Sequence, residues 1–539
     1  MSDYTRIRTP FTAMSFTPDV PSNALGPLEY NSGLNVEADV RGIKKIFGEQ
    51  EILTAVPNFG IFMEGGFRSQ TSWVYIVATR NASNQGKWYM VTSSGVTNIT
   101  PGVGANPSVF FPGYVEGLNI TSGWVGNVFF INDTLNNPMY FLPTSNEITI
   151  TSDASWNYES PLGVTKTTAG FLRNFCSPNV GNILIAGNLT KTSGGIETNY
   201  PTTVRWSQAF ASQGYPATWE PTLTTVANEQ EVPVRGPLID GFFLGANFYV
   251  CSYWDTVVFT PIAYQNSAAP IFGVRLLNQG RGLLNNDCWT NTDSNVYGLD
   301  ARDIWMFDGT NFTSLANQKV KDYFFGDLNP TYYDRVFMVN NTQKYQIEIY
   351  YPDLTSTGWC NKMLSYRYDL QVWNAPKTVQ NACMGTEGPK FVSGAFNLAS
   401  RTVVYGRGDI ASAKLIQTNV GNSFINNAPI PALFERTNMT LQTDQGPVPY
   451  SSKVYVHRAL PEIAGTGSIN ITVGAANSTA QAPTYGQTGV TNIDTNTPWI
   501  TTQQQSGRTI AVKVQSNDAT DTWNLTALNW QTTIVEDAF

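Results

Sequence analysis

The stretch "DIWMFDGTNFTSL", residues 303–315, has the features of a tight β-hairpin. Its first half is rich in the aromatic and apolar residues that favour strands, and Asp308-Gly309 supplies the residue types of a tight turn with positive φ. Two other stretches repeat this order of aromatic strand, turn and short Thr-containing strand. They are "KWYMVTSSGVTNIT" at residues 87–100 and "PMYFLPTSNEITI" at residues 138–150. A repeated hairpin unit is therefore the basis of the predicted fold.

Further copies of this unit can be placed at residues 183–219, 238–274, 344–373 and 390–417, and they share a pattern rather than a signature dipeptide. A spacing of roughly 40 to 50 residues per unit is that of four-stranded propeller blades. The sequence therefore predicts an all-β protein with a six- or seven-bladed β-propeller at residues 54–428. Closure of the ring would also hide edge strands that otherwise promote aggregation.

The two ends of the chain have different patterns. From residue 429 onwards, alternating strands such as "SKVYVHR" and "RTIAVKVQSND" predict a C-terminal β-sandwich-like domain at residues 429–539. Residues 1–53, which include "PDVPSNALGPLEYNSG", are predicted to form an extended N-terminal arm. The longest helix-like segment is "SLANQKVKDYFF" at residues 314–325, with Ser314 as its N-cap.

The charge of the chain limits its partners. With 32 Lys and Arg against 40 Asp and Glu, the formal net charge is −8, and the basic residues are scattered singly rather than clustered. Tight nucleic-acid binding needs a basic footprint that neutralises phosphates, so the composition argues against it. A wall of like charge repels phosphates and still allows a nucleic acid to pass.

Neither membrane insertion nor secretion is predicted. The N-terminal "MSDYTRIRTPFTAMSF" lacks the apolar region of a secretory signal, and no window approaches the roughly 20 apolar residues of a membrane span. The cysteines have no CxxC spacing, so no zinc or redox motif is predicted, and free thiols in apolar runs are expected to pack as small hydrophobes. These features predict a protein that is soluble where it is made and is assembled in the cytosol. The five cysteines are Cys176, Cys251, Cys288, Cys360 and Cys383.

Three acidic residues around the opening stretch, Asp300, Asp303 and Asp308, invite comparison with a calcium loop. An EF-hand loop takes its ligands from alternate positions around a central Gly, and here the acids are spaced differently. The hairpin interpretation instead places these acids at strand ends, with Asp308 in the turn. A propeller-associated cation is the alternative.

Residues that usually perform catalysis are scarce. His457 is the only histidine, so Ser-His-Asp or Cys-His catalysis would depend on it, and a multi-histidine metal site within one chain is excluded. Glu220, Glu229 and Glu231 lie near Trp219 and are the carboxylates to consider for glycoside hydrolysis, but no sialidase-type Ser-x-Asp-x-Gly-x-Thr-Trp box is present. The chain is therefore predicted not to be an enzyme, with no catalytic, cofactor-binding or metal-binding residues and no cofactor.

Two short motifs do not indicate a binding site. Gly280-Arg281-Gly282 lacks the third glycine and the following helix of a phosphate-binding loop. Arg407-Gly408-Asp409 matches an integrin-binding triplet, but three residues recur by chance.

The segment from residue 281 to residue 373 resembles the tail hub or nozzle proteins of short-tailed bacteriophages (podoviruses), also called tail tubular or packaged-DNA stabilisation proteins. A blade in that family has an aromatic strand, a Gly turn, a short helix, a strand ending in Tyr-Pro and a Tyr-Asp…Trp hairpin. The likeness extends over residues 203–539 and is weaker before that. The matching positions here are Tyr297, Gly309, a helix at 319–325, Tyr351-Pro352, and Tyr368-Asp369 with Trp373.

The resemblance implies a structural virion protein that forms a ring, a homo-oligomer of six copies, at the distal end of the tail. The ring would lie below a tail adaptor protein, with tail fibres, spikes or a needle beside or below it, and would be assembled in the bacterial host cytoplasm. Phage double-stranded DNA would pass through its channel without sequence-specific binding, held in until ejection. The alternative function is a glycan-binding or glycan-cleaving propeller protein of the tail that recognises a host receptor.

Overall fold

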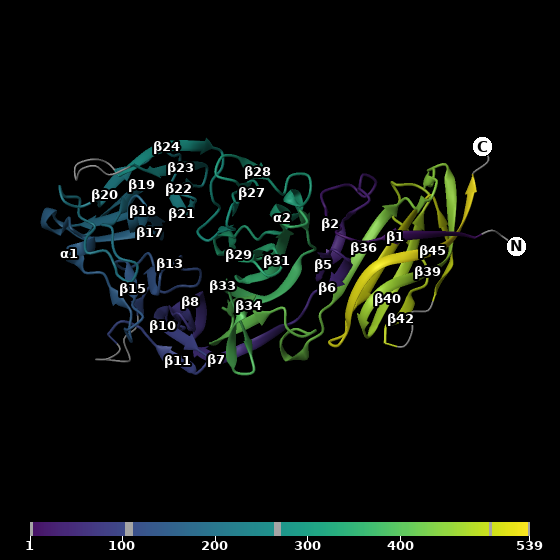
Figure 1. Cartoon of the computed structure of the whole chain (residues 1–539), viewed down its shortest axis with the longest axis horizontal. Helices are drawn as coiled ribbons and strands as arrows, with labels where there is room; N and C mark the ends of the chain where they lie inside the picture. Colours follow the sequence, from purple (N-terminus) through teal and green to yellow (C-terminus); the bar gives the residue numbers. More distant parts are fainter. Residues whose placement is uncertain (1–3, 103–110, 263–270, 495–498, 537–539) are drawn as a thin grey trace.

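The chain folds almost entirely into antiparallel β-sheets, as its strand-like periodicity predicts. The computed structural model describes residues 4–102, 111–262, 271–494 and 499–536, with 58% of the chain in strands and 4% in helices. Two bodies are visible in Figure 1: one contains sheets from the middle of the chain, and the other combines yellow C-terminal strands with purple N-terminal strands. The all-β class is therefore confirmed.

Within the described residues, five antiparallel meanders of four strands follow one another between residues 59 and 314. Short turns keep the strands of each sheet in sequence order, and the first sheet gains one short extra strand. The five sheets are β8 (Phe59–Ser69), β9 (Ser72–Arg80), β10 (Gln85–Thr92) and β11 (Gly95–Asn98) with β12 (Phe111–Pro112); β13 (Thr121–Val125), β14 (Val128–Asn132), β15 (Met139–Phe141) and β16 (Thr149–Ile150); β17 (Val164–Ser177), β18 (Gly181–Ser193), β19 (Ile196–Trp206) and β20 (Asn228–Glu231); β21 (Leu238–Leu244), β22 (Asn247–Ser252), β23 (Asp255–Pro261) and β24 (Phe272–Gln279); and β25 (Trp289–Asn291), β26 (Val296–Leu299), β27 (Ile304–Phe307) and β28 (Phe312–Ser314).

An eight-stranded sheet follows, and it consists of two halves. The sixth group of strands is β29 (Phe337–Asn341), β30 (Gln346–Tyr351), β31 (Cys360–Arg367) and β32 (Val372–Trp373). The seventh is β33 (Lys377–Val392), β34 (Ala395–Arg407), β35 (Ser412–Thr418) and β7 (Glu49–Pro57). Only a short irregular pairing of β31 with β33 joins the halves. The outer strand of the seventh group, β7, thus comes from near the N-terminus and pairs with β35.

The first strands of the seven groups contact one another in chain order. β13 contacts β17, β17 contacts β21, β25 contacts β29, β29 contacts β33, and β33 returns to β8. The indole of Trp289 in β25 donates to Asp240 in β21 at 2.8 Å, and Gly66 in β8 lies so close to Trp124 in β13 that a Cβ there would clash with the indole. The seven groups therefore form a circular series.

The C-terminal body contains two sheets whose inner faces share one apolar core. One sheet has the order β43 (Ile500–Gly507), β39 (Ser452–Thr466), β45 (Thr522–Glu536), β6 (Gly42–Lys45) and β5 (Val36–Asp39), with β1 (Thr5–Pro10) also paired to β45. The other has β4 (Ser32–Leu34), β36 (Ala432–Met439), β44 (Thr509–Ser516), β40 (Ser468–Ala476) and β41 (Thr484–Tyr485), with β42 (Gly489–Asn492) on β40. Two small ribbons are β2 (Ser15–Phe16) with β3 (Glu29–Tyr30), and β37 (Gln442–Thr443) with β38 (Gly446–Pro447).

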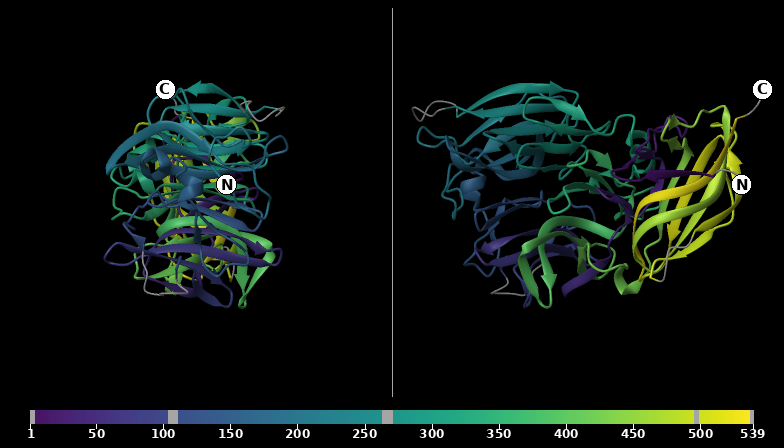
Figure 2. Two further views of the ribbon diagram at one scale, coloured as in Figure 1. Left: turned by 90° about the vertical axis from the view of Figure 1, so that its left-hand side faces the viewer. Right: turned by 45° about the vertical axis from the view of Figure 1, so that its right-hand side comes forward.

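The segment predicted as an extended arm is part of this C-terminal body. β1 runs antiparallel to β45 from Thr5 opposite Thr532 to Pro10 opposite Ala527, and Ile7 is buried opposite Trp530. β4 pairs with β36, and β6 pairs with β45. In Figure 2, the purple N-terminal strands lie against the yellow and light green strands of this body. This segment is not the extended arm that the sequence predicts. Its short strands pair with strands about 400 to 530 residues further along the chain, and the local sequence pattern does not indicate such distant partners.

A buried charge cluster joins the two bodies. The carboxylate of Glu37 in β5 lies 2.9 Å from the Lys344 ammonium, 2.8 Å from that of Lys377 and 3.4 Å from that of Lys44, and its side chain is 1% exposed. Burial opposes ionisation, but the three lysines outweigh it and hold the pKa of Glu37 well below its usual value. Because Lys344 and Lys377 belong to the sixth and seventh groups, this cluster fixes the junction.

Helices are short in the described residues, and the main one starts later than predicted. α2 spans Lys321–Asp327, and α1 (Asp153–Trp156) and three 3₁₀ turns (Ser160–Leu162, Tyr333–Arg335, Ile425–Asn427) are shorter still. Ser314 does not cap α2, because its hydroxyl donates to Asp303 and accepts the Asn317 N–H. The carboxylate of Asp19 instead accepts the N–H groups of Asp322 and Tyr323 at 2.7 and 2.8 Å.

Candidate functional site

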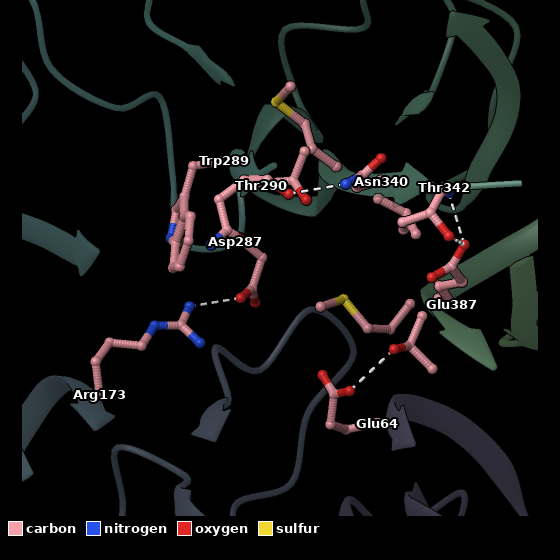
Figure 3. A pocket seen from close by; sticks show the side chains of 14 residues that line it. Glu64, Arg173, Asp287, Trp289, Thr290, Asn340, Thr342 and Glu387 are labelled. Carbon is pink, nitrogen blue, oxygen red and sulfur yellow. Dashed lines mark hydrogen bonds and ion pairs between the residues drawn. The ribbon is translucent and has the colours of Figure 1, made fainter. Parts of the chain in front are cut away.

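Polar and charged side chains of the circular series surround a cavity of about 340 Å³. We call it the central cavity. Its walls come from the first strands of the first, third, fifth, sixth and seventh groups. Figure 3 shows that the charged side chains Glu64, Arg173 and Glu387, from three different strands, and Asp287, from the turn before β25, extend toward the same space.

Arg173 in β17 is the main connector of this region. Its guanidinium donates to both carboxylate oxygens of Asp240 in β21 at 2.8 and 2.6 Å, to Asp287 at 2.6 Å, and to the Ser122 carbonyl in β13 at 2.9 Å. It also lies 5.4 Å from the ring centre of Trp289. Burial opposes the charge of Arg173, but the two carboxylates outweigh it and raise its pKa. One side chain therefore links four consecutive groups of strands through charge-assisted bonds.

Glu64 in β8 has a different environment. Its Oε1 accepts the Gly65 N–H and the Thr386 hydroxyl, both at 3.0 Å. Burial raises the pKa of Glu64 to about 7, and the charge of Asp287 adds to the effect. Burial also raises the pKa of Asp287, although Arg173 opposes it. The cavity thus holds a carboxyl group that changes its charge near neutral pH.

Polar bonds around the cavity link every pair of neighbouring groups, and together we call them the central circuit. Glu64 joins the first group to the seventh, and Arg173 joins the second, third and fourth. The remaining links are Glu387 accepting the Thr342 N–H at 2.6 Å, Asn340 donating to the Asn291 carbonyl at 2.9 Å, Trp289 donating to Asp240, and Asn127 donating to the Phe67 carbonyl at 2.8 Å. Its acidic groups are therefore engaged in holding the strands. Within the described ranges, no group of three or more His, Cys, Asp or Glu has the arrangement of a metal site.

The acids of the opening stretch lie at strand ends, as the hairpin interpretation predicts. Asp308 accepts the N–H groups of Thr310 and Asn311, and Gly309 has a φ of 92°. Asp300 and Asp303 both bind the Arg281 guanidinium, at 3.2 and 2.8 Å. Arg281 of the Gly-Arg-Gly segment is therefore a partner of these acids rather than part of a phosphate loop.

The carboxylates considered for glycoside hydrolysis are not brought together as a pair of free acids. Glu229 lies 2.8 Å from the Lys191 ammonium and 2.6 Å from the guanidinium of the fully buried Arg205. Glu231 accepts the Thr202 hydroxyl at 3.1 Å, and Glu220 is exposed.

The other residues named from the sequence have structural surroundings. His457 lies in β39, where its Nε2 is 2.9 Å from the Thr533 hydroxyl. In the integrin-like triplet, Arg407 binds Asp409 itself at 2.7 Å. Among the cysteines, Cys251, Cys288 and Cys360 are buried, Cys383 is half-buried and Cys176 is exposed.

Sequence reasoning missed the central circuit. Glu64, Arg173 and Asp240 each interrupt an apolar strand: "FGIFMEGGFRS", "VTKTTAGFLRNFCS" and "LIDGFFL". A charge inside a buried strand needs a partner, so these interruptions were a usable signal. The partner of each charge could not be identified from the sequence, because 67 residues separate Arg173 from Asp240.

No protein-family model matches the chain, and no curated protein matches it significantly. In the part of the chain that the structure describes, no helix has the length and apolar character needed to cross a bilayer.

Proposed function

We propose that this chain is a structural protein of a short-tailed phage virion. Several copies, six by analogy with the tail hub and nozzle proteins that the sequence resembles, form a ring at the distal end of the tail. The ring lines the DNA channel, retains the packaged genome and conducts it during ejection. The chain acts as a wall and as an assembly partner, without catalysis.

The observation that carries this proposal is the central circuit. A circular series of seven four-stranded groups, closed where β33 meets β8 and where β7 pairs with β35, supports a seven-bladed β-propeller. Polar bonds join every pair of neighbours, and those of Arg173 to Asp240 and Asp287 and of Glu387 to Thr342 are charge-assisted, which makes such a ring rigid. A rigid closed body suits a building block that must survive the pressure of packaged DNA without opening.

The C-terminal body supports the assembly role. Its two facing sheets support a β-sandwich-like platform to which both ends of the chain contribute strands. The Glu37 cluster fixes this platform to the propeller. We therefore assign contacts with neighbouring copies and with the tail adaptor to the platform, and the distal wall to the propeller.

Charge supports a channel through which DNA slides. Each chain carries a formal −8, so six copies carry −48, and a field of that sign opposes adhesion of phosphates. DNA then passes without sequence-specific contacts, as the scattered basic residues already predict.

The tryptophans give the glycan alternative little support. That alternative was motivated by the 14 tryptophans of the chain together with the predicted propeller, and most of these tryptophans are core residues. Trp156 and Trp219, for example, pack edge to face at 4.7 Å with neither exposed, and a buried indole is not available to a sugar ring.

The proposal is tested with phage particles assembled without this protein. We expect them to package DNA and then lose it, measured as nuclease-sensitive DNA released from purified particles, and the protein supplied in trans should restore retention. Negative-stain electron microscopy of the purified chain or tail should show closed rings. Particles that lack the protein but remain full, stable and infectious would refute it.

A further inference from the structure

A second cavity, of about 290 Å³, lies in the C-terminal body between β1, β36 and the loop that connects β2 to β3. We call it the arginine cavity. Its wall combines the apolar side chains of Pro10, Leu25, Leu28 and Met439 with polar ones that include Asn23, Asn438 and Gln442. Two guanidinium groups, those of Arg8 and Arg436, also line it. Apolar surface beside a few polar and charged groups is the usual composition of a small-ligand site.

Arg436 is a buried cation with no ion-pair partner among the described residues. Only 7% of its surface is exposed. Its Nη1 and Nη2 donate to the backbone carbonyls of Pro27 and Gly26, and its Nε has no acceptor among the described residues. No carboxylate of the described chain forms an ion pair with it. Carbonyl groups satisfy hydrogen bonds, but they do not neutralise a full positive charge.

Other buried arginines of this chain differ in this respect. Arg173 binds Asp240 and Asp287, and Arg205 binds Glu159 and Glu229. At Arg436, burial lowers the pKa to about 10, and the charge of Glu29 only partly opposes that change. The carboxylate of Glu29 is used elsewhere, because it accepts the Gly26 N–H at 2.7 Å. Arg436 therefore lacks the partner that the chain provides for comparable residues.

The second arginine of the cavity is already neutralised. Arg8 forms a two-point pair with Glu462 at 2.8 and 2.6 Å and is half-exposed. Arg8 therefore does not need a further anion as a partner. The group that needs a counter-charge is therefore Arg436. The apolar side chains next to it favour a ligand with an apolar body.

We propose that the arginine cavity binds a carboxylate carried on a small apolar body, such as a short-chain aliphatic acid. The carboxylate supplies the counter-charge for Arg436, and the hydrocarbon contacts Leu25, Leu28 and Met439. This inference is independent of the role of the protein in a phage tail, because it concerns only the C-terminal body.

The test uses the full chain with hexanoate as the probe, and with hexanol and hexylamine as probes of the same length without the negative charge. We expect hexanoate to raise the melting temperature saturably in the millimolar range, with a shift that follows mass action. Hexanol and hexylamine should bind at least about tenfold more weakly. Isothermal titration gives the stoichiometry, which should be one per chain.

Two variants locate the site. Arg436→Met should weaken hexanoate binding at least about tenfold while the ligand-free melting temperature stays equal or rises, since an unneutralised buried charge is removed. Leu25→Trp should block binding by filling the cavity while Arg436 remains in place, and it keeps the test valid if Arg436→Met does not fold. Arg458→Met, which removes an exposed charge from the same body, is the matched control and should bind normally.

Three results would overturn the proposal. They are the absence of a saturable response in the wild-type protein, equal binding by wild type and Leu25→Trp, and hexylamine binding as tightly as hexanoate.

Discussion

Replacement of Arg173 by Met is the most direct test of the central circuit. The substitution removes the two-point bond to Asp240, the bond to Asp287 and the bond to the Ser122 carbonyl, while it keeps most of the side-chain volume. Asp240 is fully buried, so it would remain as a charge without a cation. Breaking a buried ion pair in this way costs about 3–5 kcal/mol. We expect a loss of that size in the free energy of unfolding at pH 8.

The loss should depend on pH. Without the guanidinium, the pKa of Asp287, which burial already raises, should rise further. Between the unfolded-state pKa of about 3.9 and the raised folded-state pKa of Asp287, the folded variant would bind more protons than the unfolded chain. The free energy of unfolding of the variant therefore falls as pH rises through that window. The difference from wild type should therefore be smaller at pH 5 than at pH 8.

Urea denaturation followed by tryptophan fluorescence measures both effects. The matched control is Arg8→Met, which breaks the half-exposed pair with Glu462 and should cost no more than about 1 kcal/mol. If Arg173→Met lowers the free energy of unfolding as little as this control does, or by the same amount at pH 5 and pH 8, the central circuit does not hold the seven groups of strands together.

Three further predictions concern other buried groups. Glu64→Gln should stabilise the protein at pH 8 by on the order of 3 kcal/mol and have little effect on its stability below pH 4. The reason is that the pKa of Glu64 is raised to about 7, so that ionisation is unfavourable in the folded state. Equal urea unfolding midpoints of wild type and variant at pH 8 would contradict this prediction. Glu37→Gln should cost about 3–5 kcal/mol at pH 7, since Lys344 and Lys377 lose their counter-charge while Lys44 keeps Asp39 at 3.1 Å. The difference should shrink as pH falls below about 4, where wild type also loses the contribution of a carboxylate whose pKa is lowered. A cost that is constant from pH 7 to pH 3 would exclude this explanation. Gly298→Ala should lower the free energy of unfolding by about 1–3 kcal/mol, because the added Cβ would lie 2.2 Å from the Trp305 ring. The control is Gly326→Ala in α2, where the added Cβ meets no atom, and this change should be neutral or stabilising. Equal melting temperatures for the two alanine variants would show that the close approach is unimportant.

The local part of the fold could be predicted from the sequence, because turns and strands depend on neighbouring residues. Asp308-Gly309 forms the hairpin turn that its residue types favour, and Asp300 and Asp303 lie at strand ends. The helix start could not be predicted, because the cap comes from Asp19, about 300 residues away. The same limit applies to the central circuit. The charged residues were visible inside apolar strands, but only the three-dimensional order of the groups brings Arg173 to Asp240.

The arginine cavity illustrates a related limit. Arg8, Leu25 and Arg436 are unremarkable in the sequence, because exposed arginines and leucines are common. Only the pairing of β1 with β45 and of β4 with β36 places the N-terminal loop over Arg436 and buries it. A charge that becomes unusual only through burial cannot be identified before the fold is known.

The pairing of distant segments has a consequence for biosynthesis. β7 cannot find β35 until residue 418 has left the ribosome, and β1 cannot find its place until β45, which ends at Glu536, has emerged. Domains usually fold in order as they are synthesised, but here each body waits for a late strand. A prematurely terminated chain would therefore keep open strand edges in both bodies, and such edges promote aggregation.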